Sequence, residues 1–220
     1  MSTATPVLTR GAVAAIETTK TIRNAYLLLT MILGVSALSA WYAVASQAGV
    51  INVWMFLAFM IGMPFAINAT RNSPAGLVLS FVYAAGLGYL LGPIVGFYLR
   101  MDANIPVYAL AATSVIFFSL SGYALVSRRN FNFLGGFLFV GFLVMLGAIV
   151  ANIFLQTPIL SLMISGAAVL LVSAAILWET SQLIHDPEAN YIVVATSLLG
   201  SIWVLFMHLM RLFAFFSGED

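Results

Sequence analysis

Seven apolar runs, each long enough to cross a bilayer as a helix, constrain this chain more than any other feature of its sequence. They cover approximately residues 25–46, 52–69, 76–98, 105–126, 133–155, 158–182 and 191–216. A helix of about 20 apolar residues spans the hydrocarbon core of a membrane, whereas barrel strands alternate apolar and polar residues, which these runs do not. The sequence therefore predicts an all-α, polytopic membrane protein built as a seven-transmembrane helix bundle.

Composition agrees with this class, and because the connections between the runs are short, we expect no soluble domain. Hydrophobic residues make up 63% of the chain and charged residues 7%, against about 45–50% and about 25% in soluble domains. We expect three parts: a polar N-terminal tail over residues 1–24, the membrane domain over 25–216 and a short C-terminal tail over 217–220.

The first apolar run is predicted to be a retained span rather than a cleaved signal peptide. The apolar part of a signal peptide has about 7–15 residues, and this run is longer and begins only after the polar tail. The chain has no cysteine, which excludes disulfides, thiolate metal sites and a cysteine nucleophile.

The distribution of Lys and Arg predicts the orientation in the membrane. Only Arg100 and Arg211 lie toward the side opposite the N-terminal tail. Because basic residues concentrate on the cytoplasmic side, we expect a cytoplasmic N-terminus and, after seven spans, a C-terminus outside. A re-entrant last span would instead return the C-terminus to the cytoplasm. The six basic residues on the side of the tail are Arg10, Lys20, Arg23, Arg71, Arg128 and Arg129.

Glu179 is the one acidic residue inside a long apolar run, and ionisable groups at membrane depth commonly mark functional sites. Small and polar residues recur around it at three- and four-residue spacing, which places them on one helix face, and the last run carries a similar strip. Since the two helices are antiparallel, we expect the strips to face each other, either as a functional site or as a packing surface. The strips are Ser161, Ser165, Ala168, Val172, Ala175, Glu179 and Gln182, and Asn190, Ser197, Ser201, Val204, His208 and Arg211.

Depth in the membrane selects the partners expected for Glu179. With a rise of ~1.5 Å per residue, Arg211 lies near the opposite face, whereas Ser197 and Ser201 lie at a similar level. Arg71 is the only cation close to that level. We therefore expect an Arg71–Glu179 pair bridged by hydroxyls or water. The alternative is that both side chains reach toward water at the interface without touching.

A further stripe in the third run has small residues at every fourth position, which lets another helix backbone approach closely. Its residues are Ser80, Ala84, Gly88 and Gly92, and Pro93 follows. Because proline lacks a backbone donor and clashes with the preceding turn, we expect a kink near this end of the helix.

Five segments of the sequence occur in the order and spacing of known family motifs. They are SFVYAAGLGYLLGP at residues 80–93, Phe133-Leu134-Gly135-Gly136, Asn152-Ile153-Phe154, Glu179-Thr180 and Asn190-Tyr191-Ile192. Together they resemble the Bax inhibitor-1 family of seven-span membrane proteins, and most closely its bacterial YccA-type branch. The first segment is similar to the family's third-span motif and the second to its FLGG element. The resemblance covers roughly residues 20–216.

The resemblance implies, for many family members, a pH-sensitive Ca²⁺ leak in which two aspartates on spans six and seven share a proton and an arginine from span two joins them. Glu179 occupies the span-six position, and the span-seven position falls at or near Ser201. The second carboxylate is thus missing. This loss removes the like-charge pair and leaves a poor site for Ca²⁺, which prefers about six to eight oxygen ligands.

The same resemblance implies a partner. YccA-type members are similar to modulators of FtsH, the ATP-dependent protease of the bacterial inner membrane, which they occupy as slowly degraded substrates. The polar stretch from Met1 to Arg23 suits this role, because an unfolding machine can grip a flexible terminus. The expected partners are therefore the lipid bilayer and the FtsH complex. The alternative function is a Ca²⁺ or proton leak with a degenerate two-acid sensor.

Other functional classes find little support in the sequence. A retinal protein needs a lysine in its last span, but the only lysine is Lys20. A serine protease needs a histidine beside an activated serine, and His208 and Ser121 lie toward opposite membrane faces. His185 and His208 do not have the spacing of metal ligands with each other or with acidic residues. No Gly-rich nucleotide-binding loop occurs in the sequence. We expect no enzymatic activity, cofactor, metal site or nucleic-acid partner.

Overall fold

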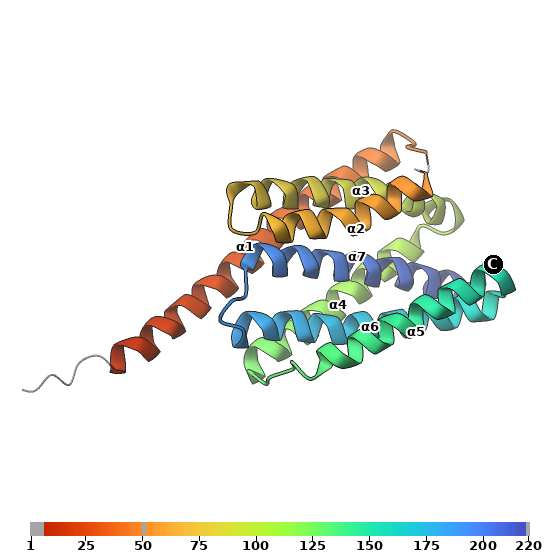
Figure 1. The fold of residues 1–220 in the computed structure, drawn as a ribbon. Helices are drawn as coiled ribbons and strands as arrows, with labels where there is room; N and C mark the ends of the chain where they lie inside the picture. Colours follow the sequence, from red (N-terminus) through yellow and green to blue (C-terminus); the bar gives the residue numbers. More distant parts are fainter. Residues whose placement is uncertain (1–6, 50–51, 219–220) are drawn as a thin grey trace, which may run out of the picture.

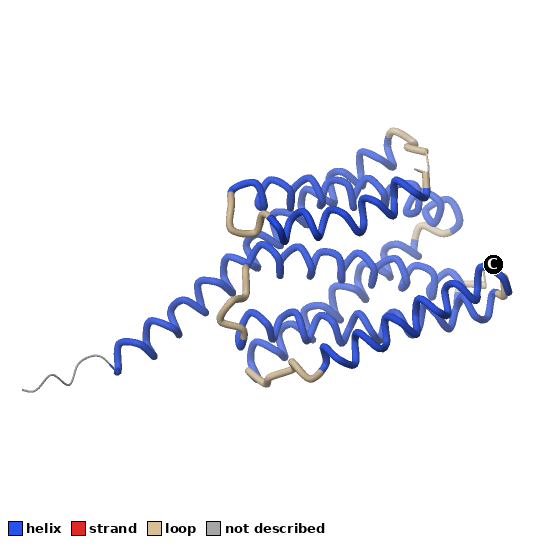
Figure 2. Tube along the Cα trace, in the orientation of Figure 1, coloured by secondary structure: helices blue, strands red, loops and turns tan. Residues whose placement is uncertain are grey.

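The computed structural model describes residues 7–49 and 52–218, and every regular element within them is an α-helix (Figures 1 and 2). Short loops join consecutive helices, so that neighbours in the chain run antiparallel. The predicted all-α bundle of seven helices is confirmed for this part of the chain. The helices are α1 (Val7–Ala45), α2 (Val53–Ala69), α3 (Pro74–Met101), α4 (Asn104–Ser127), α5 (Leu134–Leu155), α6 (Pro158–His185) and α7 (Tyr191–Phe216).

The lengths of the helices match the thickness of a membrane. Six of them are long and apolar enough to cross it. The seventh, α2, is apolar but has 17 residues, which makes it about 25 Å long and places it at the short end for a span. α7 is one unbroken helix of 26 residues. The last span is therefore not a re-entrant pair, and the start of α1 and the end of α7 lie at opposite ends of the bundle (Figure 1).

α1 extends into the segment predicted to be the N-terminal tail. Its 39 residues begin at Val7, so the helix continues through most of the segment predicted to be a separate tail. Extending an existing helix avoids the cost of nucleation, and no proline interrupts the chain between Pro6 and Pro64. The N-terminal part of α1 projects beyond the other helices (Figure 1). The first six residues of the predicted tail lie outside the described part of the chain.

α7 is the central helix of the bundle. It packs against α1, α2, α3, α4 and α6, and its residues Leu198, Leu205 and Met210 are fully buried. By contrast, α5 packs against α6 alone among the described helices and has no buried residue. The residues that face α7 are therefore shielded from lipid, whereas most of α5 is available to it.

α1 and α3 form the most extensive helix pair. They approach over the small-residue stripe of α3, where Ala84 is completely buried. A Cβ atom at Gly88 would overlap the carbonyl oxygen of Ser36, and one at Gly92 would overlap Ala43. Only glycine permits this separation of the two backbones. α3 continues through Pro93 as a single helix, and the kink expected there remains a prediction.

Candidate functional site

Glu179 is buried between α6 and α7, with 7% of its surface exposed. Ser201 Oγ donates to Oε1 at 3.1 Å and to Oε2 at 2.9 Å, and Ser197 Oγ also donates to Oε1. These two serines lie one turn apart on α7 and therefore share a helix face. The carboxylate has hydroxyl donors from the neighbouring helix, but among the described residues no cation contacts it.

The facing strips predicted on α6 and α7 are joined at both ends. At one end the contacts of Glu179 join them. At the other end, Arg211 Nη2 donates to Ser161 Oγ at 2.8 Å, and Asn152 Nδ2 of α5 donates to the same oxygen at 2.8 Å. Because polar groups inside a membrane have no water to bond, these hydrogen bonds set the register of α6 on α7.

Two cavities meet at Glu179. The first has a volume of about 360 Å³ and lies between α2, α3, α6 and α7, where Tyr83 and Ser201 contribute to its wall. The second has a volume of about 230 Å³ and lies toward the loop end, where Arg71 contributes. Glu179 and Ser197 line both cavities. The carboxylate is therefore placed at the boundary between the loop end and the middle of the bundle.

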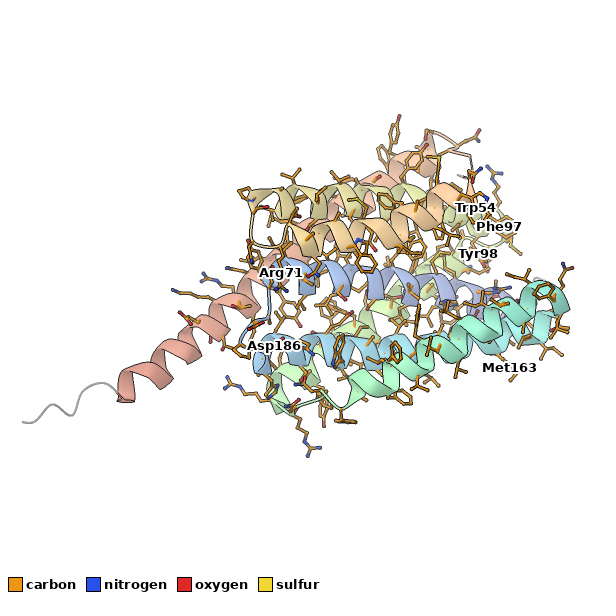
Figure 3. All side chains as sticks on the ribbon, in the orientation of Figure 1. Trp54, Arg71, Phe97, Tyr98, Met163 and Asp186 are labelled. Atoms are coloured by element: carbon orange, nitrogen blue, oxygen red, sulfur yellow. The ribbon has the colours of Figure 1, made fainter. Side chains whose placement is uncertain are left out.

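Arg71 lies in the loop between α2 and α3, at the same end of the bundle as Asp186 (Figure 3). Asn190 holds this loop, because its Nδ2 donates to the Arg71 carbonyl oxygen at 2.9 Å and to Asn72 Oδ1 at 3.2 Å. Arg71 and Glu179 thus share one cavity, but no ion pair joins them within the described residues. The bridged pair between them remains a prediction.

Asn190 has a second function that spacing alone did not reveal. Its Oδ1 accepts a hydrogen bond of 2.9 Å from the backbone N–H of Ile192 and so caps the start of α7. One side chain therefore caps the central helix and holds the loop that carries Arg71. The signal in the sequence was only an asparagine immediately before a helix, which predicts the cap but not the loop contact.

Two further contacts join segments that are distant in the sequence. The N–H of Phe131 donates to Ser181 Oγ at 3.0 Å and holds the α4–α5 loop against α6. Tyr26 and Ser121 are hydrogen-bonded between α1 and α4. Sequence analysis missed both contacts, because their partners lie 50 and 95 residues apart and no helical period relates them.

The loops that carry Arg71, Arg128 and Arg129 gather at one end of the bundle. The contacts of Asn190 and Ser181 hold these loops to the ends of α6 and α7. Tyr98, which lies in the same cavity wall as Arg211, is at the opposite end (Figure 3). The two membrane sides that the sequence predicts from its basic residues therefore correspond to the two ends of the folded bundle. Which end faces the cytoplasm remains a prediction.

The fold and the site together define a class: a multi-pass helical membrane protein whose central helix supplies hydroxyl donors to a buried carboxylate. Residues 18–218 match the family described as "Inhibitor of apoptosis-promoting Bax1". The chain belongs to this Bax inhibitor-1 family, which confirms the family predicted from its motifs.

Bacterial relatives narrow the family to one branch. The Escherichia coli K12 protein named "Modulator of FtsH protease YccA" is 39% identical over 205 residues, which cover 93% of this chain and 94% of the relative. A protein of Escherichia coli O6:H1 with the same identity and coverage is named "Inner membrane protein YccA". An uncharacterized protein of Pseudomonas aeruginosa is 39% identical over 206 residues, which are 93% of each chain. The predicted YccA-type branch is confirmed.

Proposed function

We propose that this protein acts in a bacterial inner membrane as a modulator of an FtsH-type ATP-dependent protease, and that it performs no catalysis itself. The observation that carries the proposal is its 39% identity, over 93% of the chain, to the relative named as a modulator of that protease. A similarity of this extent covers most of the chain, so the relative is expected to share most of the bundle.

The projecting start of α1 supports this proposal. It extends beyond the other helices at the end where the loop with Arg71 lies (Figures 1 and 3), and Glu17 and Lys20 on it are exposed. We propose that this end faces the cytoplasm, because it collects the basic loops. A protease that pulls on an exposed terminus would then begin with α1.

The packing of α1 gives a physical reason for slow degradation. A pull on its start is resisted by α3, which α1 contacts at Gly88 and Gly92 with no space for a Cβ atom. The contact between Tyr26 and Ser121 adds a link to α4. A substrate that enters the protease but resists extraction from the membrane keeps the protease occupied, so that other substrates are degraded more slowly. Occupancy of this kind needs no chemistry from the modulator.

The test uses purified FtsH-type protease, a second membrane substrate and this protein in the same vesicles. The full chain is expected to slow degradation of the second substrate, and a chain lacking residues 1–20 is expected to have no effect. A variant with residues 1–20 in scrambled order is the matched control and should still slow degradation, because it keeps the length and composition of the segment. If the full chain has no effect, the proposed function is wrong. If the truncated chain slows degradation as much as the full chain does, engagement of the N-terminal segment is wrong.

A Ca²⁺ or proton leak is the second candidate function, and the two cavities that meet at Glu179 favour it. A conducting path needs space beside a polar group at membrane depth, and Glu179 borders a cavity on both sides. The site offers one carboxylate and two hydroxyl groups, which are fewer oxygen ligands than the about six to eight that Ca²⁺ prefers. Vesicles that contain the purified protein and a Ca²⁺- or pH-sensitive dye test this function. A flux of Ca²⁺ or protons that Glu179→Gln alters would support the leak function. Absence of flux at pH values on both sides of neutrality would exclude it.

A further inference from the structure

Arg211 is a cation near the end of α7 for which the described residues provide no acidic partner. It lies five residues before the end of the helix at Phe216, which is about 8 Å along the axis. One of its N–H groups donates to Ser161 Oγ, and a guanidinium has about five such donors in a fixed plane. A cation at this depth is costly unless an anion or water satisfies the remaining donors.

The guanidinium borders a cavity of about 240 Å³ at the end of the bundle opposite Arg71. The cavity is a cleft between α3 and α6, which do not pack against each other, and α7 forms its base. Phe97 and Leu162 make its walls apolar, and Tyr98 places a ring with a hydroxyl group beside the cation. Figure 3 shows Phe97 and Tyr98 together at this end of α3. The cleft thus combines one cation with an apolar surface.

We propose that this cleft binds one phospholipid of the adjacent leaflet, with its phosphate on Arg211 and an acyl chain along Phe97 and Leu162. The phosphate is the anion that a bilayer supplies at the ends of its spanning helices. A guanidinium binds it through two parallel N–H···O bonds, with a geometry that a lysine does not reproduce. The apolar walls of the cleft would cover the first carbons of the acyl chain. This binding site is independent of the proposed action on the protease.

Binding is tested by native mass spectrometry of the full-length protein in detergent, titrated with dioleoyl phosphatidylglycerol. The wild type should bind one lipid, and Arg211→Gln should weaken that binding about tenfold, as expected for the loss of a charge-assisted hydrogen-bonded pair. Dioleoylglycerol, which has the same acyl chains without the phosphate, should not bind. Arg100→Gln should bind the lipid as the wild type does, because Arg100 is an exposed cation at the same end and does not border the cleft.

Two further variants separate binding from folding. Ser161→Ala removes the hydrogen bond to Arg211 but keeps the cation, and should retain the lipid. Leu162→Trp fills the cleft and should lose it, and this variant decides the test if Arg211→Gln does not fold.

Several results would overturn the proposal. They are equal binding by wild type and Arg211→Gln, equal binding of dioleoylglycerol, and displacement of the lipid by inorganic phosphate at millimolar concentration. Glu219 and Asp220, which lie outside the described residues, are a further source of a counter-ion. If only a Glu219→Gln/Asp220→Asn variant binds the lipid, these acids occupy Arg211 and the proposal is wrong.

Discussion

Ser201 Oγ on α7 donates to both carboxylate oxygens of Glu179 on α6, at 3.1 and 2.9 Å. By the family resemblance, this serine lies at or near the position where a second acid would complete a proton-sharing pair. A hydroxyl group at this position donates to the carboxylate, whereas a second carboxylate would compete with it for a proton. The contact therefore joins two helices, and we expect its main effect to be on the stability of the bundle.

Glu179→Ala is expected to lower the thermal stability of the protein. The change removes the hydrogen bonds that Ser197 and Ser201 donate to the buried carboxylate, and a hydrogen bond to a charged group contributes about 1.5–3 kcal/mol. Glu179→Gln keeps an acceptor oxygen and should cost less. The measurement is thermal unfolding of each variant in detergent. Glu188→Ala is the matched control, because it removes an exposed carboxylate from the nearby loop. Unchanged stability in both Glu179 variants would show that the contact does not hold α6 to α7.

Gly88→Ala is expected to separate α1 from α3. The new Cβ atom would overlap the carbonyl oxygen of Ser36, and a forced backbone shift of this kind costs about 1–3 kcal/mol. Gly96→Ala is the matched control on the same helix, since no atom lies within 4 Å of a Cβ built there. Thermal unfolding should show a clear loss for Gly88→Ala and no loss for Gly96→Ala. Equal stability of the two variants would contradict the close approach of the helices.

Asn190→Asp is expected to separate the two functions of this side chain. An aspartate still caps α7 by accepting from Ile192 but cannot donate to the carbonyl oxygen of Arg71. Amide hydrogen exchange should therefore become faster in the α2–α3 loop, while the first turn of α7 keeps its protection. Asn190→Ala should lose both, with a cap contribution of about 1 kcal/mol.

Asn52 provides the control for this experiment. It caps α2 in the same way, through a hydrogen bond of 2.9 Å from the N–H of Trp54. Asn52→Ala should therefore affect the start of α2 and leave exchange in the loop with Arg71 unchanged. A loop that exchanges equally in wild type, Asn190→Asp and Asn190→Ala would show that Asn190 does not position it.

The second cavity is expected to admit small water-soluble reagents as far as Ser197. The chain has no cysteine, so a single introduced thiol reports its own access. Ser197→Cys should react with a small hydrophilic thiol reagent, because residue 197 is exposed and lines both cavities. Ser165→Cys, on α6, should not react, because residue 165 is completely buried and borders neither cavity. Equal labelling of the two variants would argue against a water-accessible path to Glu179.

The orientation of the bundle is tested by the same chemistry in intact cells. Pro187 in the α6–α7 loop and Ala103 between α3 and α4 are exposed at opposite ends. A membrane-impermeant reagent should label Ala103→Cys in cells whose outer membrane is permeable, and Pro187→Cys only after the inner membrane is opened. The reverse pattern would place the N-terminus outside and contradict the orientation predicted from the basic residues.

The sequence by itself determined the helices, their number and the family. Hydropathy and helical period are local properties, so the run that became α7 and the exceptional position of Glu179 could be recognised without any tertiary contact. The sequence analysis placed the end of the tail at residue 24 from the change in polarity, and α1 continues beyond that boundary to Val7. Helix propagation requires only continuous backbone hydrogen bonds, and these do not depend on polarity.

Only the tertiary structure decided which faces meet. An apolar helix in a membrane has no hydrophobic penalty that selects its partner, so steric fit and a few hydrogen bonds make the choice. The approach of α1 to Gly88, the link from Asn190 to the loop of Arg71 and the cleft at Arg211 all join segments that are far apart in the chain. The spacing of residues along one helix states which face is small or polar, but it contains no information on what lies opposite.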